Sequence, residues 1–241
     1  IGIDVGGTFT DIVAVSDTGT VTFSKAASTP NDPSIGAMNA VERLAEELGI
    51  NSETLLSKTE SIVHGTTVAT NALLERKGAK TGLLTTLGHR DVLEMREGLK
   101  DDRYNMRLPA PAPLVPRFLR LGVRERIKPD GSIHTKLDDA SLDEAINKLR
   151  EEKVTSVAVC YLHAYKEPKH EQETKKILEA RLPGVSVSIS SEVFPEIKEY
   201  ERVSTTIVNA YVRPIVENYL NRLEGRLKNA GYKGSVLIIL S

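Results

Sequence analysis

The chain lacks most of the features that mark a secreted, disulfide-stabilised or membrane-spanning protein. Its 241 residues include no tryptophan and one cysteine, Cys160, which cannot form an intrachain disulfide. That cysteine lies in the apolar run 157–162, so we expect a small, buried hydrophobic side chain. No apolar run approaches the roughly 20 residues that span a bilayer, and no signal-peptide pattern opens the chain.

Charge of one sign is also lacking. The 32 basic and 33 acidic residues are interspersed and give a net charge of −1. This balance provides no broad attraction to nucleic acid or to an anionic membrane. We therefore expect a soluble cytoplasmic protein that binds neither nucleic acid nor a membrane. The chain is long enough for one large domain or two small ones.

The most informative segment is residues 1–15, IGIDVGGTFTDIVAV. Apolar runs before and after Gly6-Gly7 predict two strands joined by a tight turn. Oxygen-bearing side chains surround that turn: Asp4, Thr8, Thr10 and Asp11. This concentration of polar groups between two apolar strands predicts a ligand site at the tip of a hairpin.

The turn has the chemistry of a phosphate site. Two glycines let backbone N–H groups approach an anion without interference from a Cβ, and threonine hydroxyls can donate to phosphate oxygens. Asp4 closes the first strand, where a carboxylate can hold Mg²⁺ directly or through water. A plain hairpin turn is the alternative, because Gly-Gly is a common turn former, but it needs no such polar cluster. No GxxxxGK[ST] or GxGxxG motif follows, which excludes the strand–loop–helix type of nucleotide site. We therefore predict a loop that binds phosphate and magnesium and is built on a β-hairpin.

Strand-like and helix-like segments alternate, which predicts an α/β fold that begins with an antiparallel hairpin. Strands are expected at 1–5, 11–16, 20–26, 61–64, 80–85, 154–161, 185–190 and 235–240. Helices are expected at 33–48, 138–149, 168–182 and 196–230, the last with a kink or a reset at Pro214. The Pro-rich segment 108–117 predicts a stiff connector. It would join a phosphate-loop half, 1–107, to a second α/β half, 118–241.

Residues 4–11, DVGGTFTD, resemble the first phosphate motif of the actin/hexokinase/Hsp70-type ATPases, and most closely that of the hydantoinase/oxoprolinase family. Further segments resemble the same family in the same order: 64–75, 88–94 and 190–211. The resemblance implies the N-terminal lobe of an actin/hexokinase-like (ribonuclease H-like) ATPase, with a mixed sheet and flanking helices. Both ends of the chain fall inside strand-like runs. We therefore expect 1–241 to be the N-terminal, N-methylhydantoinase A-type region of a longer polypeptide, with the second phosphate motif beyond it.

The resemblance also implies an activity, the ATP-dependent hydrolysis of a cyclic amide such as a hydantoin, 5-oxoproline or a related lactam. ATP and Mg²⁺ would be the cofactors, and a hydantoinase B-type subunit or domain would be the partner. The loop glycines and threonines would hold phosphates: Gly6, Gly7, Thr8 and Thr10. Asp4 would hold the metal. Asp11 would either position a metal-bound water or a loop hydroxyl, or act on the nucleophile.

Three other segments have open interpretations. Thr66 or Thr67 would cap a helix and bring its N–H groups to an anion, or the segment is a plain N-cap with His64 as a spacer. Arg90 opens either a binding segment or a charged surface helix. By resemblance, the run with Glu199, Tyr200 and Arg202 is a candidate for an active-site or interlobe role. By composition it is a solvated first helical turn.

The main rival function is an ATP-dependent ketone carboxylase subunit of the acetone or acetophenone carboxylase kind, which phosphorylates an enolate oxygen. Residues 95–100 keep it open, because they depart from the Gly-Arg-Gln-Asn-Arg-Pro-like run of many hydantoinase-type members. A sugar-type kinase shares the phosphate loop but lacks the other matched segments. A nucleotide-gated assembly subunit without chemistry of its own is a further alternative. We favour the hydrolytic route.

Overall fold

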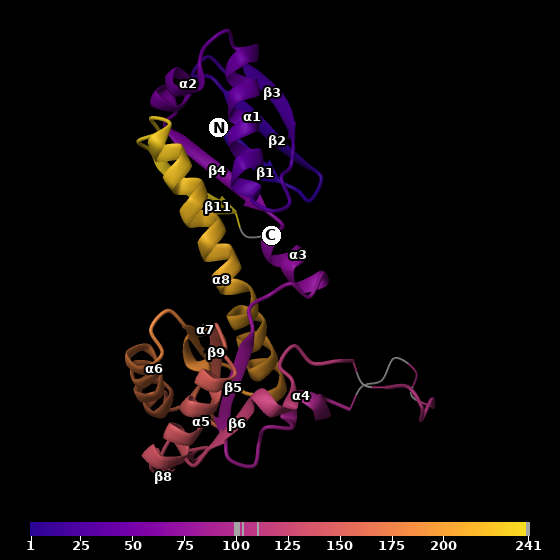
Figure 1. Cartoon of the computed structure of the whole chain (residues 1–241), viewed down its shortest axis with the longest axis vertical. Coiled ribbons are helices and arrows are strands. Elements are labelled where there is room, and N and C mark those ends of the chain that lie inside the picture. The colour runs from indigo at the N-terminus through magenta and orange to yellow at the C-terminus, as the bar shows by residue number, and fades with distance from the viewer. Residues whose placement is uncertain (99–101, 103, 110, 240–241) are drawn as a thin grey trace. The chain divides into compact units, whose positions relative to one another are not determined.

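A computed structural model describes residues 1–98, 102, 104–109 and 111–239. They form two compact units (Figure 1). Unit 1 comprises Ile1–Glu75 and Ile215–Ser241, and unit 2 comprises Arg76–Pro214. These boundaries differ from the predicted division into 1–107 and 118–241. The physical reason is that the last strand of the chain pairs in parallel with a strand of the first quarter, so the C-terminal segment belongs to the N-terminal sheet.

Unit 1 is built on a five-stranded mixed sheet with the order β11-β4-β1-β2-β3. The strands are β1 (Gly2–Val5), β2 (Phe9–Val15), β3 (Val21–Ala27), β4 (Ser61–Thr66) and β11 (Ser235–Ile239). The first three strands are antiparallel, as the predicted hairpin requires, whereas β1, β4 and β11 run parallel. The carboxyl ends of β1 and β4 therefore meet at one edge of the sheet.

One face of this sheet holds the core of unit 1. Ile3, Ile12 and Ile62 on that face are at most 2% exposed. They pack against α1 (Pro33–Glu47), α2 (Ser52–Lys58) and the C-terminal part of α8 (Glu199–Asn229). Because strand side chains alternate between faces, Asp4 and Asp11 lie on the opposite, exposed face.

Helix α1 begins as its sequence predicts. Asp32 is the N-cap, and its Oδ1 accepts from the Ser34 amide at 3.2 Å, with Pro33 in the first turn. Arg226 of α8 then donates to Asp32 Oδ2 at 3.1 Å and to Ser34 Oγ at 2.9 Å. The start of α1 is thereby tied to the last turns of α8.

Unit 2 contains an all-parallel sheet with the order β10-β9-β5-β6. Its strands are β5 (Thr81–Thr86), β6 (Arg120–Val123), β9 (Ser156–Cys160) and β10 (Ser186–Ile189). Its longer helices are α5 (Asp139–Glu151), α6 (Lys169–Arg181) and the N-terminal part of α8. The short elements are α3 (Val68–Leu74, in unit 1), α4 (Val92–Met95), a 3-10 turn (Arg117–Leu119), β7 (Arg126–Ile127), β8 (Ile133–Thr135) and α7 (Ser190–Val193).

The eight predicted strands and the four predicted longer helices are all present, but the strands β6, β7 and β8 and the short helices α2 and α7 were not predicted. β6 is four residues long and contains Arg120, which is 2% exposed. Its guanidinium is buried because it donates to Glu94 Oε2 at 2.9 Å and to the Val115 carbonyl at 3.0 Å. The ion pair with Glu94 joins segments 26 residues apart, so no local pattern indicated a buried strand.

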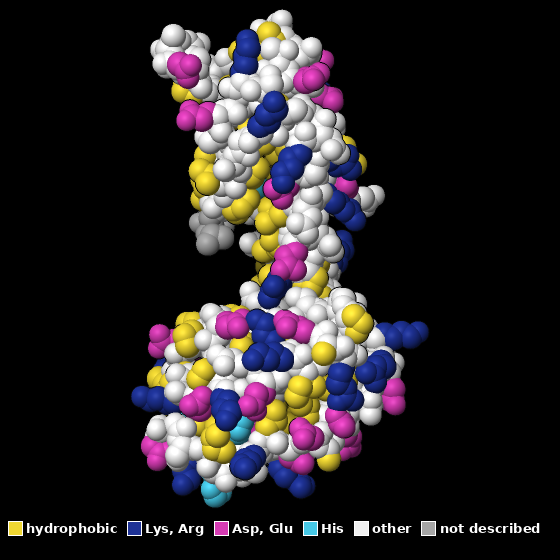
Figure 2. Space-filling model, turned by 90° about the vertical axis from the view of Figure 1, so that its left-hand side faces the viewer, with side chains coloured by type: hydrophobic (Ala, Val, Ile, Leu, Met, Phe, Trp, Pro, Cys, Tyr) yellow, Lys and Arg dark blue, Asp and Glu magenta, His cyan; other side chains and the backbone are white. Residues whose placement is uncertain are grey.

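Helix α8 continues through Pro214 without interruption, so the predicted reset does not occur. Cys160 is 5% exposed, which confirms the predicted buried side chain. Among the residues that the structure describes, no helix is both long and apolar enough to cross a membrane. Figure 2 shows basic and acidic side chains interspersed over the visible face, as the balanced charge predicts.

The Asp32 cap generates a prediction about stability. Burial acts to raise the pKa of Asp32, but hydrogen bonds from Ser34 and Arg226 outweigh it and hold the pKa below its ordinary value. Asp32→Ala removes the cap and should lower the free energy of unfolding at pH 7 by about 1–2 kcal/mol. Asp32→Asn can still cap, so it isolates the contribution of the charge.

Because the folded pKa is lowered, the stabilisation from the Asp32 charge is complete above the ordinary carboxyl pKa. It is lost as the pH falls through the lowered folded value. The difference between wild type and Asp32→Asn in urea unfolding should therefore shrink from pH 7 to pH 3. A difference that stays constant over this range would contradict the assignment.

Candidate functional site

The exposed face of the unit 1 sheet carries an open groove with a volume of about 1250 Å³. Predicted site residues in its wall are Asp4, Asp11, Thr66 and Thr67. Apolar side chains also line it, including Phe23 and Ile239, and so do the cations of Lys25 and Arg43. The groove thus joins carboxylates, hydroxyls and cations above a partly apolar floor.

The two predicted carboxylates face each other across the hairpin. Asp4 pairs directly with Asp11 in the antiparallel β1–β2 register, so both side chains project from the same face. Asp11 Oδ1 lies 3.0 Å from Lys25 Nζ on β3, and both side chains are more than half exposed. Lys25 also lies over the Phe9 ring, 4.7 Å from its centroid. Sequence reasoning missed Lys25, because its position depends on the β2–β3 register.

Gly65 makes room for the Asp4 carboxylate. It pairs with Asp4 in the parallel β1–β4 register. A Cβ at this position would lie 3.2 Å from Asp4 Oδ1, closer than an ordinary van der Waals contact. The family-like segment 64–75 contains this glycine, but its role became visible only when β4 was placed beside β1.

The glycine turn is held by backbone contacts. The Gly6 amide donates to the Phe9 carbonyl at 3.0 Å, and Ser28 donates through its amide to the Thr8 carbonyl at 2.9 Å. Neither Gly6 nor Gly7 has a positive φ, so the turn does not use the left-handed freedom of glycine. What Gly6 provides is space, since a Cβ there would lie 3.1 Å from the Phe9 oxygen. Gly7 and Thr8 are exposed at the tip.

Thr10 is placed differently from the prediction. It is fully buried, on the α1 side of the sheet, and its Oγ1 lies 3.0 Å from Ser28 Oγ. Ser28 Oγ donates its only proton to the Gly6 carbonyl at 2.8 Å, so Thr10 must be the donor to Ser28. The Thr10 hydroxyl therefore braces the turn from behind instead of facing the groove. Ser28 was not recognised from the sequence.

The second predicted segment adjoins the hairpin. Thr67 is the N-cap of α3 but makes no side-chain capping bond, whereas the hydroxyl of the preceding Thr66 accepts from the Val68 amide at 3.2 Å. Thr67 Oγ1 instead accepts from Asn71 Nδ2 at 3.2 Å. A Cβ at Gly7 would lie 3.6 Å from that same Asn71 nitrogen. The structure therefore brings the glycine turn and the start of α3 together.

His64 lies behind the groove and is completely buried. Its Nδ1 is 3.2 Å from the Ile3 carbonyl and its Nε2 is 2.8 Å from the Tyr219 hydroxyl. A carbonyl only accepts, so Nδ1 carries the proton and Nε2 accepts from Tyr219. Burial lowers the pKa of His64, against the opposing effects of the Ile3 carbonyl and the Asp4 charge. A neutral His64 thus joins β1, β4 and α8.

In the described part of the chain, no three His, Cys, Asp or Glu side chains converge as a metal centre. Asp4 and Asp11 provide two carboxylates, which are too few to coordinate a metal ion fully with protein ligands alone. Such a pair suits Mg²⁺, which keeps several waters and is bound through one or two carboxylates together with phosphate oxygens.

Comparison with known proteins supports the resemblance. The family model for the hydantoinase/oxoprolinase N-terminal region matches residues 1–182. Caprolactamase subunit alpha of Pseudomonas jessenii is 42% identical over 96% of this chain, and acetophenone carboxylase gamma subunit of Aromatoleum aromaticum is 36% identical over 99%. In both cases the match covers 34% of the relative, so the chain spans about a third of their length.

Solved structures agree. The crystal structure of ATP-dependent caprolactamase from Pseudomonas jessenii superimposes with a TM-score of 0.91 at 40% identity, over 98% of this chain and 35% of that one. Nucleotide-free acetone carboxylase gives a TM-score of 0.86 at 28% identity, again over 98% and 35% of the two chains. The predicted fold class, an α/β lobe of an actin/hexokinase-like ATPase with a mixed sheet and flanking helices, is confirmed. The chain belongs to the hydantoinase/oxoprolinase family.

Proposed function

We propose that the protein containing this chain hydrolyses a cyclic amide in an ATP-dependent reaction and that the unit 1 groove binds the ATP phosphates. The observation that carries the proposal is the exposed Asp4–Asp11 pair at the mouth of a glycine turn, with Gly65 leaving room beside Asp4. Caprolactamase, whose alpha subunit is 42% identical, is described as ATP-dependent. Its substrate class, a lactam, is the one we propose here.

The chemistry accounts for the need for ATP. Resonance makes an amide carbonyl a poor electrophile, and phosphorylation of its oxygen would activate the carbon for attack by water. Collapse of the tetrahedral adduct would break the C–N bond, release the ring nitrogen as an amine and leave an acyl phosphate. Hydrolysis of the acyl phosphate would then give the carboxylate and inorganic phosphate. The initial phosphoryl transfer requires that the phosphates be positioned and their charge be offset. Asp4 would hold Mg²⁺, directly or through water, and the ion would supply that charge compensation.

The chain's own groups have distinct roles in this proposal. The exposed Gly7 amide and Thr8 hydroxyl would contact phosphate oxygens, and Thr66 and Thr67 would line the opposite side. Gly6, whose amide already donates to the Phe9 carbonyl, would shape the turn. Thr10 acts indirectly, by holding the turn through Ser28. Lys25 fixes one oxygen of Asp11. This ion pair favours a role for Asp11 in positioning water and disfavours a role as the base that removes a proton from the nucleophile.

A partner subunit is part of the proposal. The names of the caprolactamase alpha subunit and the acetophenone carboxylase gamma subunit describe components of assemblies. We propose a hydantoinase B-type subunit or domain as the counterpart of this chain, working in the cytoplasm. Ketone carboxylation is the second candidate function, because the acetophenone carboxylase gamma subunit is 36% identical over 99% of the chain. Of the divergent segment 95–100, residues 99 and 100 lie outside the described residues.

Asp4→Asn tests the phosphate site. Asp4 is exposed, so the variant should keep the wild-type melting temperature. It should lower lactam-stimulated ATP hydrolysis by the complete enzyme by about 100-fold or more, because charge compensation during the transfer is lost. Unchanged turnover would remove Asp4 from the site.

Thr10→Val is the matched variant on the buried face. It leaves the Ser28 hydroxyl without its donor, which should cost about 1–3 kcal/mol of stability. ATP turnover per folded molecule should stay within a few-fold of wild type, because the Thr10 hydroxyl does not reach the groove. A stable Thr10→Val protein without turnover would show instead that this hydroxyl contacts phosphate.

Isotope labelling separates the two candidate reactions. We expect the complete enzyme in ¹⁸O-water to place label in the carboxylate of a ring-opened product, because water attacks the activated amide carbon. Strict dependence of product formation on bicarbonate, with no ring-opened amide, would establish carboxylation in its place.

A further inference from the structure

Unit 2 has a crevice at the carboxyl edge of its own sheet. The chain leaves β5 to form β6 on one side and leaves β9 to form β10 on the other. Adjacent parallel strands whose connections lead in opposite directions leave a crevice between their carboxyl ends, and ligands of open α/β sheets bind there. In unit 2 this position lies between the ends of β5 and β9.

Side chains from three segments line the crevice at that position. Thr85 is the next-to-last residue of β5, Cys160 ends β9, and Glu199 and Arg202 come from the first turn of α8. His89 completes the polar part of the wall. The volume of the crevice is about 10 Å³, which is about the room that one water-sized oxygen atom needs.

Arg202 is the unusual member of this wall. It is 1% exposed, and its two terminal nitrogens donate to the Glu196 carbonyl at 3.2 Å and the Tyr161 carbonyl at 3.0 Å. Its Nε is buried and has no hydrogen-bond partner among the described residues. No carboxylate of those residues lies within 4.0 Å of its nitrogens. The guanidinium also lies over the Tyr165 ring, 5.4 Å from its centroid, and beside the Cys160 thiol. Neither group carries a full negative charge, so the buried cation still favours an anion as its partner.

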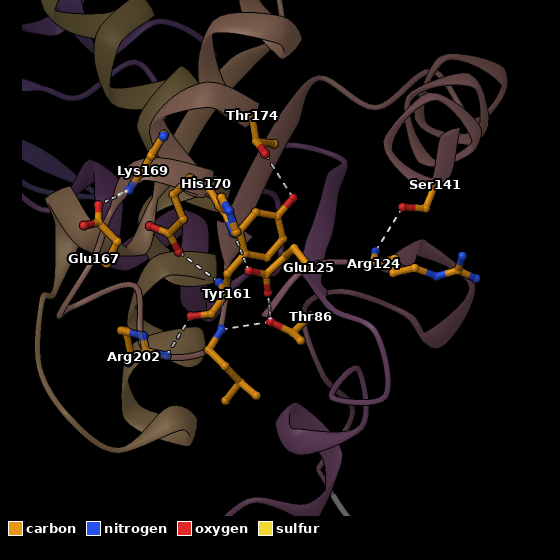
Figure 3. Close-up of polar contacts among 12 residues, drawn as sticks. Thr86, Arg124, Glu125, Ser141, Tyr161, Glu167, Lys169, His170, Thr174 and Arg202 are labelled. Atoms are coloured by element: carbon orange, nitrogen blue, oxygen red, sulfur yellow. Dashed lines mark hydrogen bonds and ion pairs between the residues drawn. The ribbon is translucent and has the colours of Figure 1, made fainter. Parts of the chain in front are cut away.

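The buried carboxylates at this edge are committed elsewhere. Glu171 accepts from the Tyr161 amide at 2.9 Å and from the Ser190 hydroxyl at 2.6 Å. Glu125 accepts from His170, 2.8 Å away, and from the Thr86 hydroxyl. Figure 3 shows Glu125 between Thr86 and His170, while Arg202 reaches the Tyr161 backbone. The described chain therefore supplies no buried counter-ion for Arg202.

His89 adds a neutral donor. Its Nε2 lies 3.0 Å from a terminal nitrogen of Arg126, which only donates, so the proton of the neutral ring is on Nδ1. Burial, together with the Arg126 charge, lowers the pKa of His89. Glu199, half-buried, is the carboxylate in the wall of the crevice and acts against an anion there. His89 thus favours anion binding, whereas Glu199 limits it.

We propose that this crevice binds a small carboxylate, one oxygen of which enters beside the Arg202 guanidinium. The site is separate from the phosphate groove and goes beyond the proposed ATP-dependent reaction. The two reactions considered above each involve a carboxylate of this kind. Hydrolysis of a lactam produces an amino acid with a terminal carboxylate, and ketone carboxylation consumes bicarbonate. Both present a planar carbon with negatively charged oxygens, which a guanidinium recognises.

The test is a calorimetric titration of the purified full chain, without nucleotide, with acetate, 6-aminohexanoate or bicarbonate at constant ionic strength. Wild type should bind acetate saturably. Tighter binding of 6-aminohexanoate identifies an amino acid as the source, and tighter binding of bicarbonate identifies bicarbonate. Absence of saturable binding for all three probes overturns the proposal.

Two variants assign the site. Arg202→Lys should weaken acetate binding by about 10-fold or more, because the lysine cannot replace the Nε–H at the crevice. Glu199→Gln should strengthen binding several-fold, because a like charge is removed. Arg107→Lys, an exposed position of unit 2, is the matched control and should bind as wild type does.

The melting temperature of Arg202→Lys reports whether this variant folds. If it does not fold, the acetate titration of Glu199→Gln still tests the proposal. Equal acetate affinity of wild type and Glu199→Gln contradicts the assignment. These titrations contain no ATP, so a negative outcome leaves the proposed lactam hydrolysis standing. Loss of lactam-stimulated ATP hydrolysis with intact acetate binding would contradict the proposed function alone.

Discussion

Unit 1 depends on the parallel pairing of β4 with β1 on one side and with β11 on the other. This pairing joins segments from the beginning and the far end of the chain, so a large loop-closure entropy opposes it. Burial of Ile3 and Ile62 against α1 and α8 offsets that entropy, since each such side chain contributes about 1.5–3 kcal/mol. The same pairing sets Asp4 beside Gly65 and brings α3 next to the glycine turn.

Buried polar groups fix the groove from behind. His64 bridges the Ile3 carbonyl and Tyr219, and Thr10 bridges to Ser28, which in turn holds the Gly6 carbonyl. Every one of these groups has its partner, as buried polar groups require. They are therefore structural, and they leave the groups on the exposed face to meet a ligand. Two Thr hydroxyls of one hairpin, Thr8 in the turn and Thr10 in β2, thus have different roles.

Arg202 in unit 2 presents the opposite case. Its Nε is buried without a partner in the described part of the chain, and the nearby acids Glu125 and Glu171 already accept other donors. A polar group whose requirements the chain does not meet is a better indicator of a ligand than one that is satisfied. The family-like run 190–211 contains Arg202, but composition alone suggested a solvated helical turn, because the burial of that turn against β9 is a tertiary property.

Local physics in the sequence determined the hairpin, the main strands and helices, the cap at Asp32 and the concentration of carboxylates and threonines around Gly6-Gly7. Alternation, helical spacing and turn chemistry act over a few residues and can be read directly. The tertiary structure alone decided the unit boundaries, the burial of Thr10, the places of Lys25 and Gly65 and the short strand β6. Each of these depends on which strands pair and on which face of the sheet a helix covers, and pairing between distant segments leaves no local periodicity to detect.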